Sequence, residues 1–310
     1  MQASNPVLSV IIVTWNNEKI IAECLEWLYK AIKTVSFETI IVDNYSSDET
    51  CKIIEEKYPA VRLVRSQDNL GFAKGNNLGF TFATGKYTML LNPDAFLNYG
   101  SPEILISYME NNPEAQVIGA DLRNADGSRQ SKLKYSTLSG ARLVNLFGFL
   151  KPFFYKAPLP KTNDMNLDLY KVHIIVGAFM LIRSSLIKEI GLFDEQFFAY
   201  FEEADFCHRA RQHGVEILYA KNFLVTHLRG ASFKQLSDRG LRIFSKSKGL
   251  FIKKHYGRGA LFLKVMRYRN KFYLYKFLSL VIPTQQIKQN QKKYQLWFQS
   301  LKEVLADTSG

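Results

Sequence analysis

Three carboxylates stand within four residues, at Glu202, Glu203 and Asp205, directly after an aromatic run. Neighbouring carboxylates repel one another, and this repulsion is a recognised way to prepare a general base. On a helix, Glu202 and Asp205 share a face while Glu203 points elsewhere, and Arg209 lies four residues after Asp205 and can pair with it. The alternative interpretation is a solvated acidic helix N-terminus, which the helix dipole favours.

A second group of candidate residues consists of Asp94 and His227, which each follow a short apolar run. Asp94 ends the turn Asn92-Pro93-Asp94, and a carboxylate on a stiff turn suits a hard divalent cation that bridges diphosphate oxygens. Arg229, two residues after His227, favours anion binding beside a metal ligand. The alternatives are an Asx turn at Asp94 and a structural role for His227.

Polar residues follow each of the first four strands that the sequence predicts. Buried strands are predicted at 8–13, 39–42, 61–64 and 87–91, because each is a short and continuous apolar run. Four successive polar strand ends favour a ligand site at the carboxyl edge of a parallel sheet. The residues at these ends include Thr14, Asn16, Asp43, Asn44, Asn69, Gly71, Asn76, Asn92 and Asp94.

Helical periodicity separates these strands, at 18–33, 48–57 and 72–83. Alternating strands and helices predict an α/β fold with a Rossmann-like, mostly parallel sheet flanked by helices. The first strand-to-helix turn lacks the glycines of the dinucleotide-binding fingerprint, and the chain has no P-loop. Nicotinamide and P-loop chemistry are therefore disfavoured.

The chain is expected to divide near residue 235. Residues 1–235 are expected to form the α/β domain, within which the Pro- and Phe-rich segment 136–170 is expected to be an irregular loop or lid. Residues 172–182 resume strand character. Residues 236–310 are expected to form a basic, mostly helical C-terminal region with breaks near Gly257 and Pro283.

The formal net charge of +13 is concentrated in the last quarter of the chain. From Arg229 to Gly310 there are 18 basic and 3 acidic residues, a net +15, against 23 and 25 over residues 1–228, a net −2. Such a basic region attracts polyanionic partners: anionic lipid, nucleic acid or a phosphorylated substrate. We do not expect nucleic-acid binding, because no binding motif is present and the acidic cluster would stay unexplained.

The N-terminal residues lack the basic segment and the cleavage pattern of a signal peptide. No apolar segment reaches the roughly 18 residues that a membrane-spanning helix needs. The three cysteines are widely spaced, which fits a reducing compartment. With the basic region, these features predict a cytoplasmic protein that lies on the inner face of the cell membrane.

Taken together, the motifs resemble those of the family-2 glycosyltransferases with a GT-A fold, over about residues 7–257. The resemblance is greatest to the bacterial rhamnosyltransferase-like branch. Seven stretches match in the order of the family, which makes the resemblance specific. They are VIIVTWNN, IIVDNYSSDET, NLGFAKGNNLG, LLNPDAFL, VGAFMLIRSS, GLFDEQFFAYFEEADFCHRARQHG and VTHLRGAS.

The resemblance implies roles on the donor side. Thr14 and Asp43 match positions that line the nucleotide base and ribose, with Asn16 and Asn44 beside them. Asn69, Gly71 and Asn76 match the loop around the nucleotide-sugar. Arg229 is also expected to bind the nucleotide-sugar. Asp94 matches the surviving carboxylate of the D-x-D metal motif, Asn92 stands where many relatives have the first Asp, and His227 matches the second metal-side ligand.

On the acceptor side, Gly177 and Ala178 match the acceptor-side turn. Glu203 matches the catalytic base of the acidic motif, where relatives usually have Asp, so the choice between Glu203 and Asp205 stays open. Glu202 is their neighbour in the candidate catalytic cluster.

The resemblance implies an inverting transferase that moves a sugar from a nucleotide-diphosphate donor, with dTDP-rhamnose as the expected donor. The expected acceptor is a saccharide or a polyprenyl-diphosphate-linked saccharide in cell-surface polysaccharide synthesis, and the expected cofactor is Mg²⁺ or Mn²⁺. UDP-galactofuranose, UDP-N-acetylglucosamine, UDP-galactose and GDP-mannose remain alternative donors. An inactive scaffold homologue also remains open, because Asn92 and Glu203 depart from the family pattern.

Overall fold

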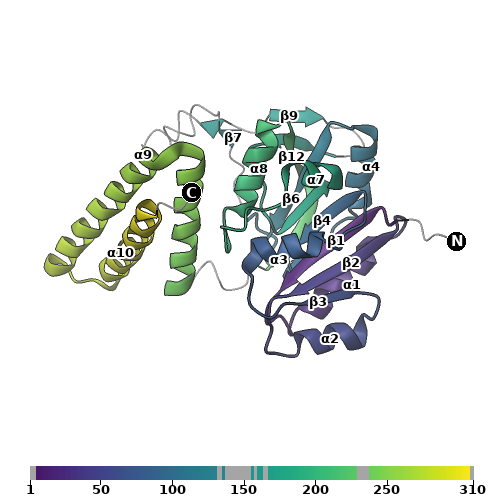
Figure 1. Cartoon of the computed structure of the whole chain (residues 1–310), viewed down its shortest axis with the longest axis horizontal. Coiled ribbons are helices and arrows are strands. Elements are labelled where there is room, and N and C mark those ends of the chain that lie inside the picture. Colours follow the sequence, from purple (N-terminus) through teal and green to yellow (C-terminus); the bar gives the residue numbers. More distant parts are fainter. Residues whose placement is uncertain are drawn as a thin grey trace. The chain divides into compact units, whose positions relative to one another are not determined.

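The computed structural model describes residues 5–130, 135–136, 155–156, 159–162, 167–228 and 237–307. The chain divides into two compact units (Figure 1). The first comprises Met1–Tyr135, Ala157–Glu195 and Glu202–Gly230, and the second comprises Ser136–Lys156, Gln196–Phe201 and Ala231–Gly310. Most of the predicted loop at 136–170 lies outside the described residues.

The first unit is built on a central sheet, in which the described residues form ten strands in the order β3-β2-β1-β4-β11-β6-β12-β10-β9, with β5 paired to β12. The strands are β1 (Leu8–Thr14), β2 (Phe37–Asp43), β3 (Arg62–Arg65), β4 (Tyr87–Leu91), β5 (Ala95–Phe96), β6 (Ala115–Arg123), β9 (Leu159–Thr162), β10 (Leu169–Val172), β11 (Phe179–Arg183) and β12 (Glu216–His227). A separate two-stranded sheet joins β7 (Tyr135–Ser136) to β8 (Tyr155–Lys156).

Helices flank this sheet, so the predicted α/β class is confirmed (Figure 1). They are α1 (Ile21–Ala31), α2 (Thr50–Lys57), α3 (Gly71–Phe80), α4 (Glu103–Asn111), α7 (Ser184–Ile190) and α8 (Glu202–Gln212). The sheet itself is mixed rather than mostly parallel. β3, β2, β1 and β4 run parallel, as their continuous apolar runs predict. β11 is antiparallel to both of its neighbours, β4 and β6.

The strand register brings the polar strand ends to one edge of the sheet. Thr14 at the end of β1 pairs with Asp43 at the end of β2. Phe179 at the start of β11 pairs with Leu91 at the end of β4. Because β11 runs antiparallel, the residues that precede it lie at the same edge as the residues that follow β4.

Of residues 172–182, where strand character is expected, only the two ends are strand: Val172 ends β10, and Phe179 begins β11. β10 pairs with β12, while β11 pairs with β4 and β6. Between them the chain leaves the sheet and buries Ile175 against Gly119, where an added Cβ would lie 2.6 Å from the Cγ2 atom of Ile175. Hydropathy alone missed this break because the connecting residues are as apolar as the strands.

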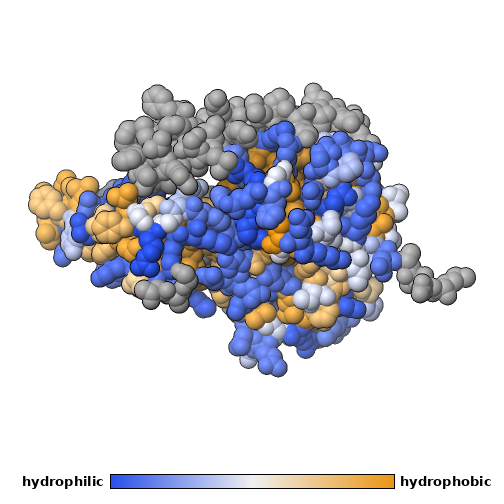
Figure 2. Space-filling view, turned by 45° about the horizontal axis from the view of Figure 1, so that its top comes forward, coloured by the Kyte–Doolittle hydropathy of each residue, from blue (hydrophilic) through white to orange (hydrophobic). Residues whose placement is uncertain are grey.

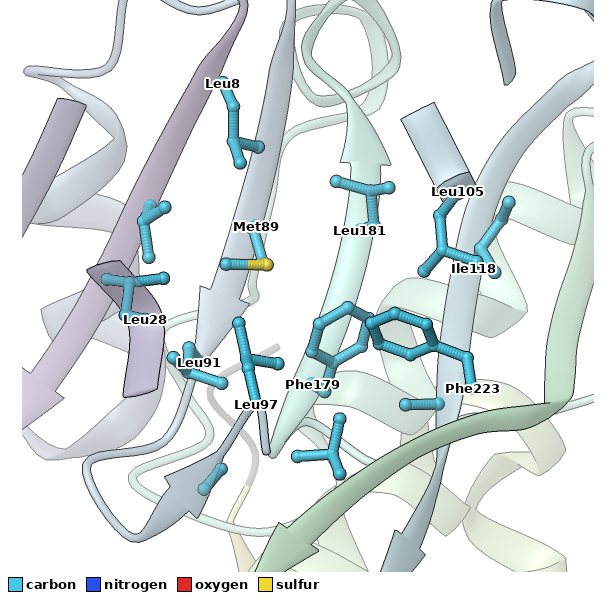
Figure 3. Packing of buried hydrophobic residues seen from close by; sticks show 14 of the residues in the cluster. Leu8, Leu28, Met89, Leu91, Leu97, Leu105, Ile118, Phe179, Leu181 and Phe223 are labelled. Carbon is cyan, nitrogen blue, oxygen red and sulfur yellow. The ribbon is translucent and has the colours of Figure 1, made fainter. Parts of the chain in front are cut away.

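Successive side chains of each strand point to opposite faces of the sheet and pack into two separate hydrophobic cores, one on each face. In β4, Met89 belongs to the core shared with α1 and α4, while Leu90 belongs to the core shared with α7 and α8. In the first core the rings of Phe179 and Phe223 lie 5.2 Å apart beside Leu181 (Figure 3). Burial on both faces explains why these strands lack a polar alternation.

The second unit contains the helices α9 (Asp238–Val281) and α10 (Gln285–Ala306). α9 is interrupted at Gly257, whose φ of 83° is a left-handed conformation that favours glycine. The two helices pack around a small core that includes Leu261, Val265 and Leu301. The predicted helical character and both predicted breaks are confirmed. No helix in the described part of the chain combines the length and the apolar character that spanning a bilayer requires.

The close packing of α3 on β1 depends on glycine. A Cβ on Gly79 would lie 2.5 Å from the Cγ2 atom of Ile11, in a buried part of the sheet. We expect Gly79→Ala to lower the free energy of unfolding by about 1–3 kcal/mol, because the added methyl group overpacks this contact. Thermal or urea unfolding measures the change.

Gly259 provides the matched control, because it lies within α9 and an added Cβ meets nothing within 4 Å. Gly259→Ala should raise the stability by roughly 0.5–1 kcal/mol through helix propensity. Equal changes in the two variants would contradict the packing argument.

Candidate active site

The ends of β1 and β2 hold buried hydrogen-bond acceptors. One carboxylate oxygen of Asp43 accepts from the backbone N–H of Ser46 at 3.0 Å. The other, Oδ1, is buried and has no hydrogen-bond partner among the described residues. Asn44 donates from Nδ2 to the carbonyl of Gly71 at 2.8 Å, and its Oδ1 is likewise buried without a described partner. Buried acceptors are normally satisfied, so these two atoms suit donors from a ligand.

The loops after β1 and β2 are bound to one another. Asn16 donates its backbone N–H to Ser46 Oγ and accepts from the backbone N–H of Ser47, both at 2.8 Å. Asn16 and Tyr45 both have left-handed φ angles, 53° and 65°, which non-glycine residues rarely adopt. Thr14 is buried and donates to Asn17 Oδ1 at 2.9 Å. The predicted residues Thr14, Asn16, Asp43 and Asn44 therefore meet in one region.

The same loops expose two aromatic rings, Trp15 and Tyr45, which the sequence interpretation did not assign to the site. Their exposed fractions are 51% and 64%. Rings on a rigid, hydrogen-bonded loop can stack on a nucleotide base. The sequence signal that could have identified them is an aromatic residue within an otherwise polar stretch directly after a strand.

The loop that begins α3 contacts this region through Gly71. Gly71 has a φ of 78°, and its N–H donates to Asn69 Oδ1 at 3.0 Å. Asn76 is buried and donates to the carbonyl of Phe72 at 2.8 Å. Asn69 and Asn76 thus hold the backbone of this loop, while the carbonyl of Gly71 reaches Asn44.

Asp94 and His227 face each other at the ends of β4 and β12. Asp94 Oδ1 lies 3.2 Å from His227 Nε2, and the backbone N–H of Leu228 donates to the carbonyl of Asp94 at 2.9 Å. Pairing of β5 with β12 sets His227 opposite Ala95, directly after Asp94. β12 runs from Glu216 to His227, and its last residues carry His227 to the site.

Gln130 holds the imidazole of His227, a role that the sequence interpretation missed. Its Nε2 donates to the carbonyls of His227 and of Arg123, the latter at 3.3 Å. Its Oε1 therefore faces His227 Nδ1 at 2.9 Å, and Nδ1 must carry the proton. Nε2 then points its lone pair toward Asp94 in the neutral ring. A lone glutamine in a loop has no sequence signal for such a role.

Asn92 completes this group. Its Nδ2 lies 3.3 Å from His227 Nε2, and its Oδ1 is buried without a hydrogen-bond partner among the described residues. In the described ranges, no group of three or more His, Cys, Asp or Glu residues is arranged so that it could hold a metal ion by itself. The carboxylate of Asp94 and the imidazole of His227 nevertheless fit a divalent cation that takes its remaining ligands from a diphosphate.

A short turn connects this group to the acidic helix. The backbone N–H of Asn92 donates to the carbonyl of Ala178 at 3.0 Å. An added Cβ on Gly177 would lie 3.7 Å from the Cβ of Glu203. The turn at Gly177 and Ala178 therefore touches the Asn92 turn with one residue and Glu203 with the other.

The three carboxylates of α8 have three different environments. Glu202 is buried, and burial together with the adjacent Glu203 charge raises its pKa well above the usual range. Glu203 is half-buried beside Gly177. Asp205 is fully buried and accepts from Arg209 Nε at 2.8 Å.

The guanidinium of Arg209 links Asp205 to the end of α7. Besides Asp205, Arg209 donates to the carbonyls of Ile190, Gly191 and Leu192. This bonding ties α8 to the end of α7 and gives Asp205 a structural partner. It favours Glu203 over Asp205 as the reactive carboxylate.

Backbone strain directly precedes the acidic helix. Tyr200 and Phe201 have φ angles of 69° and 73°, two consecutive non-glycine residues in the left-handed region. Such strain costs on the order of 1–3 kcal/mol per residue and clusters at functional sites. Arg229, the remaining predicted site residue, lies outside the described residues.

Comparison with known proteins adds an independent line of evidence. The family model described as Glycosyl transferase family 2 matches residues 9–191. The hexosyltransferase Agl10 of low-salt glycan biosynthesis in Haloferax volcanii is 28% identical over 214 residues, which cover 68% of this chain and 63% of Agl10. The N-acetylglucosaminyl-diphospho-decaprenol L-rhamnosyltransferase of Mycobacterium tuberculosis is 25% identical over 264 residues, which cover 79% of this chain and 84% of the relative.

Solved structures share the fold. The mannosyltransferase PcManGT from Pyrobaculum calidifontis, in complex with GDP-Man and Mn²⁺, superposes with a TM-score of 0.55 at 14% sequence identity. The superposition covers 99% of this chain and 89% of PcManGT. The predicted fold and family are both confirmed: the chain belongs to glycosyl transferase family 2 and has the GT-A fold.

Proposed function

We propose that this chain transfers a hexosyl group from a nucleoside-diphosphate sugar to a hydroxyl group of a saccharide acceptor, with inversion at the anomeric carbon. One observation carries the proposal: the turn at Gly177 and Ala178 touches Glu203 on one side and the Asn92 turn on the other. A carboxylate and a group of cation ligands thus flank a single short segment, as a displacement at one carbon atom requires.

The donor would bind along the strand ends of β1, β2 and β4. The buried Oδ1 atoms of Asp43 and Asn44 would accept from N–H or hydroxyl groups of the nucleoside. Asp94 and His227 would hold a divalent cation, Mg²⁺ or Mn²⁺, at the diphosphate, with Asn92 beside them. That cation, when bound, neutralises the charge that develops on the leaving diphosphate.

Within this site His227 serves as an oriented donor atom. Gln130 fixes the proton on Nδ1, so the lone pair of Nε2 is directed to the side where Asp94 lies. Without a proton or a cation between them, this lone pair would face a carboxylate oxygen at 3.2 Å. The arrangement therefore suits a shared cation.

Glu203 would act as the general base. As the acceptor oxygen forms its bond to the anomeric carbon, the bond from that carbon to the diphosphate oxygen breaks. The hydroxyl proton passes to the Glu203 carboxylate. One displacement inverts the configuration, and no covalent enzyme intermediate is formed. Burial raises the pKa of Glu202 well above the usual range and so disfavours a second negative charge beside the base.

For the donor we propose dTDP-rhamnose, and for the acceptor a polyprenyl-diphosphate-linked saccharide of cell-surface polysaccharide synthesis. The similarity to a decaprenol-linked L-rhamnosyltransferase over 79% of this chain supports both choices. A GDP-mannose or another hexose donor is the second candidate, which similarity to a hexosyltransferase and a GDP-Man complex supports.

We further propose that residues 1–235 carry the catalytic activity. The basic helical region at 236–310 would bring them to the inner, anionic face of the cell membrane, where lipid-linked acceptors lie. The absence of acidic residues between Arg239 and Lys302 supports this arrangement.

A thermal-shift panel of dTDP, UDP, GDP and CDP, each with and without Mn²⁺, tests the donor site. A ligand that binds only the folded state raises its melting temperature by mass action. We expect the largest shift with dTDP and Mn²⁺ together. No shift with any of the four in folded protein would contradict the proposed function.

Gln130→Leu, measured in the same thermal-shift panel, tests whether Gln130 positions His227, because the substitution removes both hydrogen bonds to His227. The Mn²⁺-dependent part of the shift should shrink, with an affinity loss of about 10–100-fold for the metal. Asn124→Ala is the matched control, since Asn124 bonds to Ser128 in the same loop rather than to His227. Equal Mn²⁺ dependence in both variants would remove the positioning role of Gln130.

Glu203→Gln tests the general base. The variant should lose turnover by a factor of about 10²–10⁴, because the amide cannot accept the acceptor proton. Its dTDP-dependent thermal shift should equal that of the wild type. Release of dTDP from the donor in the presence of acceptor measures the rate. A variant with full turnover would exclude this role for Glu203.

Glu202→Gln tests the neutral state of the buried carboxyl. Its folded-state pKa is raised, so above pH ~4.5 the unfolded chain loses this proton while the folded chain keeps it. The wild type therefore loses stability as pH rises through this range, and the glutamine variant does not. We expect the melting temperature of Glu202→Gln minus that of the wild type to increase between pH 5 and 8.

Glu103→Gln is the control of opposite sign. Backbone N–H groups of Lys33 and Val35 donate to Glu103, at 2.8 and 3.1 Å, and hold its pKa at about 2 despite partial desolvation. Its stabilising contribution is present above pH ~4.5 and is lost as pH falls toward 2. Glu103→Gln should therefore destabilise the protein at neutral pH and approach the wild type in acid.

A further inference from the structure

The end of the α9–α10 hairpin extends beyond its own core. The buried residues of this core occur up to Tyr268 in α9 and from Leu296 onward in α10. Between Arg269 and Gln295 none of the residues, all of which the structure describes, is buried. We call this segment, residues 269–295, the hairpin tip; it is the end of the hairpin where α9 meets α10 (Figure 1).

The hairpin tip exposes large apolar side chains in one stripe. Their helical spacing of three and four residues puts them along one side of the last turns of α9, and Ile282 continues the stripe into the connecting loop. Phe277, Leu280 and Val281 have exposed fractions of 63%, 80% and 62%. The full stripe is Tyr273, Leu274, Phe277, Leu280, Val281 and Ile282.

In the space-filling view, hydrophobic residues gather on the part of the hairpin that is drawn at the left (Figure 2). Monomeric soluble proteins rarely expose a contiguous apolar patch of this kind unless it binds something. The stripe lies outside the core of the hairpin, so packing between α9 and α10 does not account for it.

Positive charge surrounds this stripe. From Arg239 to Lys302 the chain has 16 basic residues and no acidic residue. Lys271 and Lys293 lie over the rings of Tyr294 and Trp297, at 4.9 and 5.3 Å, and so sit on the core side of the tip. Lys276 stands within the stripe and is exposed.

We propose that the hairpin tip docks on an anionic lipid bilayer. The apolar stripe enters the boundary between headgroups and acyl chains, and the surrounding Lys and Arg residues contact the anionic headgroups. Apolar insertion and electrostatic attraction are each weak alone and reinforce one another. The inference deepens the proposed function and rests on it for one element, the lipid-linked acceptor. Docking on the bilayer would bring the candidate active site close to that acceptor.

Two other occupants fit the tip less well. A second copy of this chain would bring together two tips that each carry six basic residues and no acidic residue, and these like charges repel. Single-stranded nucleic acid would use the basic and aromatic residues. It would leave the aliphatic residues Leu280, Val281 and Ile282 in water.

Sedimentation with lipid vesicles tests the proposal with the full chain. Vesicles of phosphatidylcholine with phosphatidylglycerol should bind the wild type, and vesicles of phosphatidylcholine alone should bind it far more weakly. Phe277→Ser with Leu280→Ser keeps the charge and should weaken binding to the anionic vesicles by about tenfold or more, since it removes inserted apolar surface. Both side chains are exposed, so the melting temperature should not change.

The matched control is Phe262→Ser with Leu263→Ser, which removes two similarly exposed apolar residues of α9 outside the tip. This variant should bind the anionic vesicles as the wild type does. Equal binding of the tip variant and the wild type would overturn the proposal, as would a wild type that binds no anionic vesicles.

Light scattering and binding of a single-stranded oligonucleotide identify the rival occupants. Loss of a dimer in the tip variant, or loss of oligonucleotide binding, without vesicle binding by the wild type would overturn the proposal in favour of that occupant. The dTDP-dependent thermal shift of the tip variant should equal that of the wild type. A missing shift contradicts the proposed transferase activity, whereas a missing vesicle interaction contradicts the membrane placement of the hairpin tip and of residues 236–310 and leaves the proposed activity standing.

Discussion

The candidate site depends on the antiparallel pairing of β11 with β4. Because β11 runs against β4, the residues before β11 meet the residues after β4 at one edge of the sheet. The bond from the backbone N–H of Asn92 to the carbonyl of Ala178 continues that pairing beyond the strands. A parallel β11 would put the turn at Gly177 and Ala178 at the opposite edge, away from Asp94 and His227.

The strands that support this edge could be predicted from the sequence, and the direction of β11 could not. Runs such as residues 8–13 and 87–91 are buried on both faces, so continuous hydropathy identifies them. Strand direction depends on long-range pairing, which leaves no local pattern. The same limit applies to the break between β10 and β11, where Ile175 leaves the sheet but remains buried.

Candidate site residues that lie in a family motif could be named from the sequence. Residues that contact the site only by holding another side chain could not. Asp94 and His227 belong to matched stretches, and the structure brings them within 3.2 Å. Gln130 reaches His227 from a loop 97 residues away in sequence, and an isolated glutamine carries no periodicity or spacing. Arg209 was predicted as a partner of Asp205 because helical spacing of four residues is a local property. The GT-A fold and the proximity of Asp94 to His227 were therefore accessible from the sequence, while the supporting contact of Gln130 was not.

The first turn of α8 places three nearby carboxyl groups, those of Glu202, Glu203 and Asp205, in three different environments. Asp205 is held by Arg209, a cation whose remaining N–H groups bind the carbonyls at the end of α7. Glu202 is buried, and the cost of ionising a buried carboxyl group raises its pKa well above the usual range. Glu203 alone stands half-buried beside the Gly177 turn. Carboxylates whose environments push their pKa values apart take different roles, and on this helix the ion pair of Asp205 and the burial of Glu202 support the proposal that Glu203 is the general base.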